Sequence, residues 1–161
     1  MINLNKENYL QILFFLSISI LIAAFSIQYL FGYQPCNLCV IERIPYILTI
    51  IIVLLSYKYK KDQLFYSILL LLVFSFSFLI SVYHFGIEQG FIEESSVCVS
   101  KNMDSITKEE VLKSLKQLNI SCKDVTFRIF DLSLTTYNIF ISILMFLIST
   151  KIFLITNETK Q

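Results

Sequence analysis

Four long apolar stretches constrain this fold more than any other feature of the sequence. They cover approximately residues 9–31, 40–57, 64–85 and 132–155, and the first and third contain no Asp, Glu, Lys or Arg. A helix needs about 20 apolar residues to cross a bilayer, and its backbone polar groups are then satisfied within the segment. The sequence therefore predicts an all-α membrane protein, a four-transmembrane-helix bundle that forms a single integral membrane domain over residues 1–161.

The overall composition agrees with a membrane protein and argues against a nucleic-acid partner. Of the 161 residues, 56% are hydrophobic, and the formal net charge is only +1. A chain with this charge offers neither a basic surface nor an acidic tail. We therefore expect the lipid bilayer, and no nucleic acid, among its partners.

The first apolar stretch has a competing interpretation as a secretory signal peptide. Lys6 precedes it, and Ala23-Ala24 supplies small residues of the kind found near cleavage sites. The apolar run continues well past these alanines and lacks an A-x-A-like site. We therefore expect a retained first helix.

Basic residues between the second and third stretches predict the orientation. Lys58, Lys60 and Lys61 stand in a loop of only a few residues, and short Lys-rich loops mark the cytoplasmic side. Both termini are then cytoplasmic, and Lys151, near the inner end of the last apolar stretch, agrees with this orientation. The long loop over residues 86–131 lies outside, which in a bacterium is the periplasm.

The long outer loop contains one helical pattern. Thr107-Lys108-Glu109-Glu110 resembles a capping box, and Val111, Leu112, Leu115 and Leu118 follow at helical spacing. We expect a short amphipathic helix that ends near Asn119 and lies on the membrane or against the bundle. Docking of a partner is the alternative role.

A C-x-x-C pair, Cys36 and Cys39, stands where the second apolar stretch begins. A helix N-terminus or a nearby cation lowers a thiol pKa and favours the reactive thiolate. Arg43 follows Cys39 by four residues, so on a continuous helix its charge lies one turn below that sulfur. This pattern indicates a redox centre.

Three other interpretations of the pair remain open. A four-thiolate zinc site usually has a second C-x-x-C, whereas Cys98 and Cys122 are far apart in sequence, so we expect no metal. The pair is also compatible with an inert disulfide or with two buried thiols acting as small hydrophobic groups.

A Cys98–Cys122 disulfide would close the long loop in an oxidising compartment.

Two cysteine pairs on one side of a membrane suggest an electron relay by thiol–disulfide exchange. The sequence has no G-x-G-x-x-G motif, C-x-x-C-H haem site or cluster spacing, so a lipid-soluble quinone is the natural terminal acceptor. Arg43 and His84, both at outer helix ends, are candidates to hydrogen-bond its carbonyl oxygens. An ordinary interfacial histidine is the alternative for His84.

Several separated motifs carry a family resemblance. They are residues 35–43 (PCNLCVIER), residues 83–90 (YHFGIEQG), Cys98, Ser121-Cys122 and residues 127–138. Together they closely resemble the DsbB family of disulfide-bond formation proteins, in the right order and over nearly the whole chain.

The resemblance implies an enzyme of the bacterial inner membrane that reoxidises a periplasmic DsbA-like thiol oxidase and passes the electrons to ubiquinone or menaquinone. By position, Cys98 is the residue attacked by the partner's thiolate, and Cys122 is its loop partner. Cys36 and Cys39 match the quinone-coupled pair, with Cys39 the sulfur expected to contact the quinone.

Three further residues are implied as quinone-binding. Arg43 matches the family's arginine, His84 matches a quinone-neighbouring position, and Glu88 lies one turn further on. The chain lacks the prolines that some relatives carry before the first loop cysteine, so the path of the loop near Cys98 does not follow from the resemblance.

Other protein classes fit less well. The vitamin K epoxide reductase family also combines four helices with cysteine pairs, but its C-x-x-C lies near the last helix of the bundle. A tetraspanin-like scaffold with structural disulfides would not require a C-x-x-C at the mouth of a helix. A metal transporter would carry acidic or His residues within its spans, and residues 9–31 and 64–83 contain none.

Overall fold

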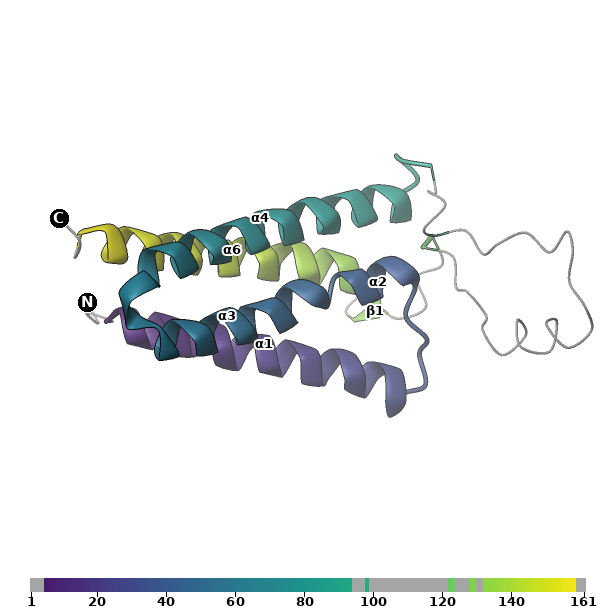
Figure 1. Cartoon of the computed structure of the whole chain (residues 1–161). Coiled ribbons are helices and arrows are strands. Elements are labelled where there is room, and N and C mark those ends of the chain that lie inside the picture. The colour runs from purple at the N-terminus through teal and green to yellow at the C-terminus, as the bar shows by residue number, and fades with distance from the viewer. Residues whose placement is uncertain (1–4, 94–97, 99–121, 124–127, 130–131, 159–161) are drawn as a thin grey trace, which may run out of the picture.

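The computed structural model describes residues 5–93, 98, 122–123, 128–129 and 132–158. Its four long helices are α1 (Lys6–Tyr29), α3 (Ile44–Lys58), α4 (Gln63–Glu88) and α6 (Leu134–Glu158), which lie side by side (Figure 1). Shorter elements are α2 (Asn37–Ile41), the 3-10 turn η1 (Lys60–Asp62), β1 (Arg128–Ile129) and β2 (Leu132–Ser133).

Four segments are long and apolar enough to cross a membrane, namely Lys6–Tyr29, Asn37–Lys58, Lys60–Glu88 and Leu134–Glu158. The prediction of an all-α membrane protein with four spanning helices is therefore confirmed. The amphipathic helix predicted after Thr107 lies outside the described residues.

The second spanning segment is broken, which the sequence pattern did not predict. Helix α2 ends at Ile41, and α3 starts only at Ile44, with Pro45 in its first turn. Proline has no N–H to donate and its ring crowds the carbonyl four residues earlier, so a helix tolerates it at the start and not in the interior. Glu42 and Arg43 lie between the two helices.

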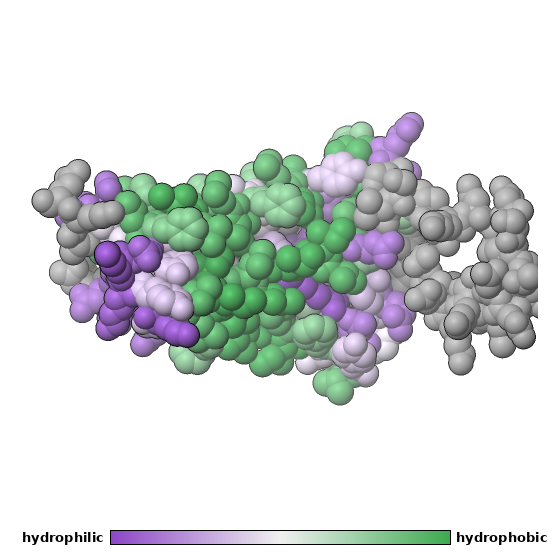
Figure 2. Space-filling model, in the orientation of Figure 1, coloured by the Kyte–Doolittle hydropathy of each residue, from purple (hydrophilic) through white to green (hydrophobic). Residues whose placement is uncertain are grey.

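The helices form a closed ring in which α3 contacts α1 and α4, and α6 contacts α4 and α1. Leu13, Val53, Phe74 and Met145, one from each helix, are fully buried in its core. Many large apolar side chains instead face outward. Figure 2 shows them as a green band along the middle of the bundle, with hydrophilic side chains gathered at the end that holds the termini. This surface suits lipid rather than water.

Small hydroxyl residues lie where α4 and α6 pack together. Ser77 of α4 and Ser142 of α6 are buried, and their hydroxyl oxygens lie 3.0 Å apart. Small side chains let membrane helices approach closely, and hydroxyl pairs across the contact add hydrogen bonds.

The cysteine-bearing segment lies at the opposite end of the bundle from the termini. Figure 1 shows the start of α1, the turn at η1 and the end of α6 at one end, and α2 and β1 at the other. Helix α4 stops at this second end in a turn where Gly90 has φ +77° and the Phe91 N–H donates to the Gly86 carbonyl. Glycine adopts this left-handed conformation without steric cost.

The last helix is aligned by a two-stranded hairpin. Strands β1 and β2 are antiparallel, with Arg128 opposite Ser133 and Ile129 opposite Leu132. The Ser133 hydroxyl accepts a hydrogen bond from the Thr136 N–H at 3.3 Å, as an N-cap residue does. This end of α6 therefore faces the cysteines in a fixed position.

Candidate redox site

Cys36 lies immediately before the first turn of α2. It is the N-cap residue of that helix, and its Sγ accepts a hydrogen bond from the Cys39 N–H at 3.2 Å. The sulfur therefore takes the place of the oxygen that usually satisfies an unpaired N–H at a helix start. The expected helix start at the C-x-x-C pair is present.

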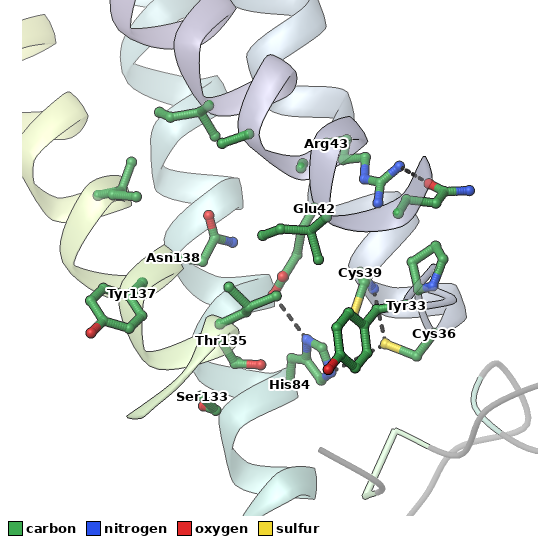
Figure 3. A pocket seen from close by; sticks show the side chains of 18 of the residues that line it. Tyr33, Cys36, Cys39, Glu42, Arg43, His84, Ser133, Thr135, Tyr137 and Asn138 are labelled. Carbon is green, nitrogen blue, oxygen red and sulfur yellow. Dashed lines mark hydrogen bonds and ion pairs between the residues drawn. The ribbon is translucent and has the colours of Figure 1, made fainter. Parts of the chain in front are cut away.

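His84 connects this sulfur to a buried carboxylate. Its Nε2 lies 3.5 Å from Cys36 Sγ, and its Nδ1 lies 3.2 Å from Glu42 Oε1. Figure 3 shows the imidazole, from α4, between Cys36, which immediately precedes α2, and Glu42, which lies in the break after α2. A thiol, an imidazole and a carboxylate thus form one hydrogen-bonded row.

The histidine and the carboxylate in this row are both buried. His84 is 3% exposed and Glu42 is 8% exposed. A carboxylate removed from water is costly unless it is paired, and the contact with His84 supplies the partner. The adjacent Arg43 does not take this role.

The surroundings of Cys36 favour its thiolate. Cys36 precedes the spanning segment that starts at Asn37, and its pKa is lowered to about 5. The largest cause is a hydrogen bond from the Cys39 side chain, followed among the lowering effects by the hydrogen bond and positive charge of His84, while burial acts in the opposite direction. Opposite charge and hydrogen bonding stabilise an anion in this way.

A cavity of about 250 Å³ opens beside the cysteines. One wall is apolar and includes Ala23 and Ala24 of α1, whose small side chains leave the space open. The other lining residues bring polar groups together at the cysteine end: Gln28, Cys36, Cys39, Glu42, Arg43, Tyr46, His84, Glu88 and Asn138. An apolar cleft with a few convergent polar groups is typical of small-molecule sites.

Arg43 lies against α1. Its Nη1 donates to Gln28 Oε1 at 2.6 Å, and its guanidinium carbon lies 5.0 Å from the centre of the Phe25 ring. The predicted position one helical turn below Cys39 assumed a continuous helix, whereas α2 ends at Ile41 and α3 begins at Ile44. Arg43 and Cys39 nevertheless line the same cavity. Among the described residues, the basic side chain in contact with Cys36 is His84.

Asn138 ties three helices together at the floor of the cavity. Its Nδ2 donates to Ser81 Oγ of α4 at 2.8 Å, and its Oδ1 accepts a hydrogen bond from the Tyr46 hydroxyl of α3. Buried polar networks of this kind fix side-chain positions when every member has a partner.

The two cysteines of the long loop, Cys98 and Cys122, lie close to the C-x-x-C pair. Cys98 and Cys122 form a disulfide, and both are buried in one cluster with Cys36, Leu38 and Ile87. Cys122 also lines the cavity. The two cysteine pairs, far apart in sequence, therefore meet at one end of the bundle.

The cavity brings together six of the seven predicted site residues: Cys36, Cys39, Arg43, His84, Glu88 and Cys122. Cys98 joins them through its disulfide to Cys122. Glu42, Gln28, Tyr46 and Asn138 were not among the predicted site residues, although Asn138 belongs to a stretch that carries the family resemblance. A charged residue within a spanning segment is itself a functional signal, so Glu42 was detectable, whereas Gln28 and Tyr46 carry no such signal.

Comparison with known proteins shows the family of this chain. The family model described as "Disulfide bond formation protein DsbB" matches residues 6–152. A protein of Rickettsia prowazekii (strain Madrid E), described as uncharacterized protein RP370, is 32% identical over 137 residues, which cover 82% of this chain and 78% of that protein. The chain belongs to the DsbB family of disulfide-bond formation proteins.

Proposed function

We propose that this protein is a quinone-dependent thiol–disulfide oxidoreductase that reoxidises a periplasmic DsbA-like thiol oxidase. The observation that carries the proposal is the meeting of both cysteine pairs at a cavity lined by Cys36, Cys39, Cys122 and His84. Family membership supports a role in disulfide-bond formation. The electron acceptor is ubiquinone or menaquinone.

The first exchange takes place at the loop disulfide. A thiolate of the reduced partner attacks Cys98 Sγ, which breaks the bond to Cys122 and releases Cys122 as a thiolate. The partner's second thiol then displaces Cys98 and completes the partner's disulfide. The loop pair has gained two electrons, and the partner has lost two.

The second exchange passes these electrons to the C-x-x-C pair in its oxidised form. Cys122 lies in the same cluster as Cys36, so its thiolate attacks Cys36 Sγ and Cys39 leaves. Cys98 then displaces Cys36 and restores the loop disulfide, which leaves Cys36 and Cys39 reduced. His84 assists because its Nε2 contacts Cys36 Sγ and stabilises the thiolate as it forms, while Glu42 keeps the imidazole oriented toward the sulfur.

The cavity residues fit a quinone head group. Arg43, His84 and Glu88 bring polar groups to its cysteine end, while Ala23 and Ala24 border it with an apolar wall. A quinone bound there would accept the two electrons of the reduced pair and take up two protons. Such an acceptor is required because DsbA-like oxidases are themselves strongly oxidising.

We propose the bacterial inner membrane as the location, with both termini cytoplasmic and the cysteine end periplasmic. The support is the cluster of Lys58, Lys60 and Lys61 at the end of the bundle opposite to α2.

The experiment that tests this function uses purified protein in detergent, a reduced DsbA-like partner and a soluble quinone, with quinone reduction followed by absorbance. We expect quinone loss and partner oxidation in a ratio of one to one, and the same rate for Ser75→Ala, whose hydroxyl bonds only its own helix at Leu71 O. Partner oxidation without quinone loss would contradict the proposal.

A further inference from the structure

The arrangement of Cys36, Cys39 and His84 offers a second chemistry besides electron transfer. One ligand atom from each residue lies within 4.8 Å of the other two. Two thiolates and an imidazole are a donor set that prefers Zn²⁺ over harder cations such as Mg²⁺ or Ca²⁺. The missing second C-x-x-C argued against zinc at the level of sequence, but the sequence alone does not place His84 beside the sulfurs.

The spacing of the ligand atoms suits a tetrahedral ion. With Zn–S near 2.3 Å and Zn–N near 2.0–2.1 Å, neighbouring donors of a tetrahedral site stand about 3.5–3.8 Å apart. Cys36 Sγ and His84 Nε2 are separated by 3.5 Å. Only small side-chain adjustments are needed for Cys39 Sγ to complete the triangle.

Glu42 provides the outer support that metal-bound histidines usually have. Its Oε1 lies 3.2 Å from His84 Nδ1, so a proton on Nδ1 is held toward the carboxylate, and Nε2 becomes a metal ligand once it gives up its own proton. A carboxylate behind a ligating imidazole fixes its orientation, and removal of such a carboxylate typically costs 10–100-fold in metal affinity.

We propose that the reduced protein binds one Zn²⁺ through Cys36 Sγ, Cys39 Sγ and His84 Nε2, with the fourth position open to the cavity. Binding releases the protons held by the thiols and by His84 Nε2, and no electron is transferred. The oxidised protein has no such site because a disulfide offers no thiolate. If the proposed function holds, bound Zn²⁺ also stops quinone reduction, since both sulfurs are occupied.

Metal binding is tested without quinone or partner, so its failure is distinct from a failure of the proposed function. The full chain carries Cys98→Ser and Cys122→Ser to leave only the C-x-x-C pair, and Co²⁺ serves as the spectroscopic probe, with Zn²⁺ as competitor. We expect one Co²⁺ per reduced chain, with thiolate charge-transfer and tetrahedral absorption bands, complete displacement by Zn²⁺, and neither band in the oxidised chain.

Substitutions then identify the ligands. His84→Gln should weaken Zn²⁺ binding at least tenfold and Glu42→Gln by about 10–100-fold. Ser75→Ala, on the same helix as His84, should leave the Zn²⁺ affinity unchanged. Zinc X-ray absorption of the chain with His84 and Glu42 intact adds a test that does not depend on the folding of these variants, and we expect two sulfur donors and at least one imidazole nitrogen. Equal Co²⁺ bands in the oxidised chain, unaltered affinity in His84→Gln, or absence of imidazole scattering would overturn the proposal.

Discussion

His84 Nδ1 and Glu42 Oε1 lie 3.2 Å apart inside the bundle, although 42 residues separate them in the chain. The contact joins α4 to the break between α2 and α3, and it directs the other imidazole nitrogen toward Cys36. The pair therefore has both a structural consequence and a chemical one.

The structural consequence is a loss of stability when the carboxylate is removed. Glu42→Ala leaves the buried His84 Nδ1 without its partner, at a cost of about 1–3 kcal/mol, and we expect the melting temperature in detergent to fall by roughly 2–10 °C. Glu42→Gln keeps an acceptor oxygen and should lose less than half as much. An unchanged melting temperature for Glu42→Ala would show that the contact is not stabilising.

The chemical consequence is a Cys36 thiolate that persists in mild acid. Because the pKa of Cys36 is lowered to about 5, alkylation of the reduced pair by iodoacetamide should keep its rate as the pH falls from 9 and decline only near pH 5. In the single-thiol variant Cys39→Ser/Cys98→Ser/Cys122→Ser, adding His84→Gln should move the midpoint upward, since the imidazolium charge is lost. Identical midpoints with and without His84 would contradict the part assigned to His84 in lowering the pKa of Cys36.

Arg43 is predicted to act on quinone affinity. Arg43→Met removes the guanidinium that lines the cavity, and we expect the KM for quinone to rise on the order of tenfold, about 1.4 kcal/mol, with little change in kcat. Gln28→Ala, which removes only the group that Arg43 Nη1 contacts, should have a smaller effect in the same direction. A fall in kcat at constant KM would place Arg43 in the chemistry of the sulfurs instead.

The orientation of the bundle is tested by single cysteines at its two ends. In a chain with all four native cysteines replaced by Ser, Gln89→Cys lies at the cysteine end and Lys60→Cys at the other, and both positions are exposed. A membrane-impermeant maleimide added to intact spheroplasts should label Gln89→Cys at once and Lys60→Cys only after permeabilisation. The reverse pattern would place the redox site in the cytoplasm.

The spanning helices could be predicted because they depend on hydropathy over about 20 neighbouring positions. The helix start at Cys36 could be predicted because it depends on the residues of a single turn. The break at Glu42 and Arg43 also has a local cause, Pro45, but a proline can either begin a helix or kink one, and the sequence alone does not decide between them. The contacts of His84 with Cys36 and Glu42, and of Arg43 with Gln28, join different helices. Their geometry depends on how the helices pack, which no local pattern specifies.

The most direct measurement of the relay compares two serine variants under two electron donors. Cys98→Ser should fail to oxidise the DsbA-like partner yet still reduce quinone at the expense of a small dithiol, because Cys36 and Cys39 remain. Cys39→Ser should still form a mixed disulfide with the partner through Cys98 but reduce no quinone with either donor. Quinone reduction by Cys39→Ser at the unsubstituted rate would contradict the relay and return the C-x-x-C pair to a structural role.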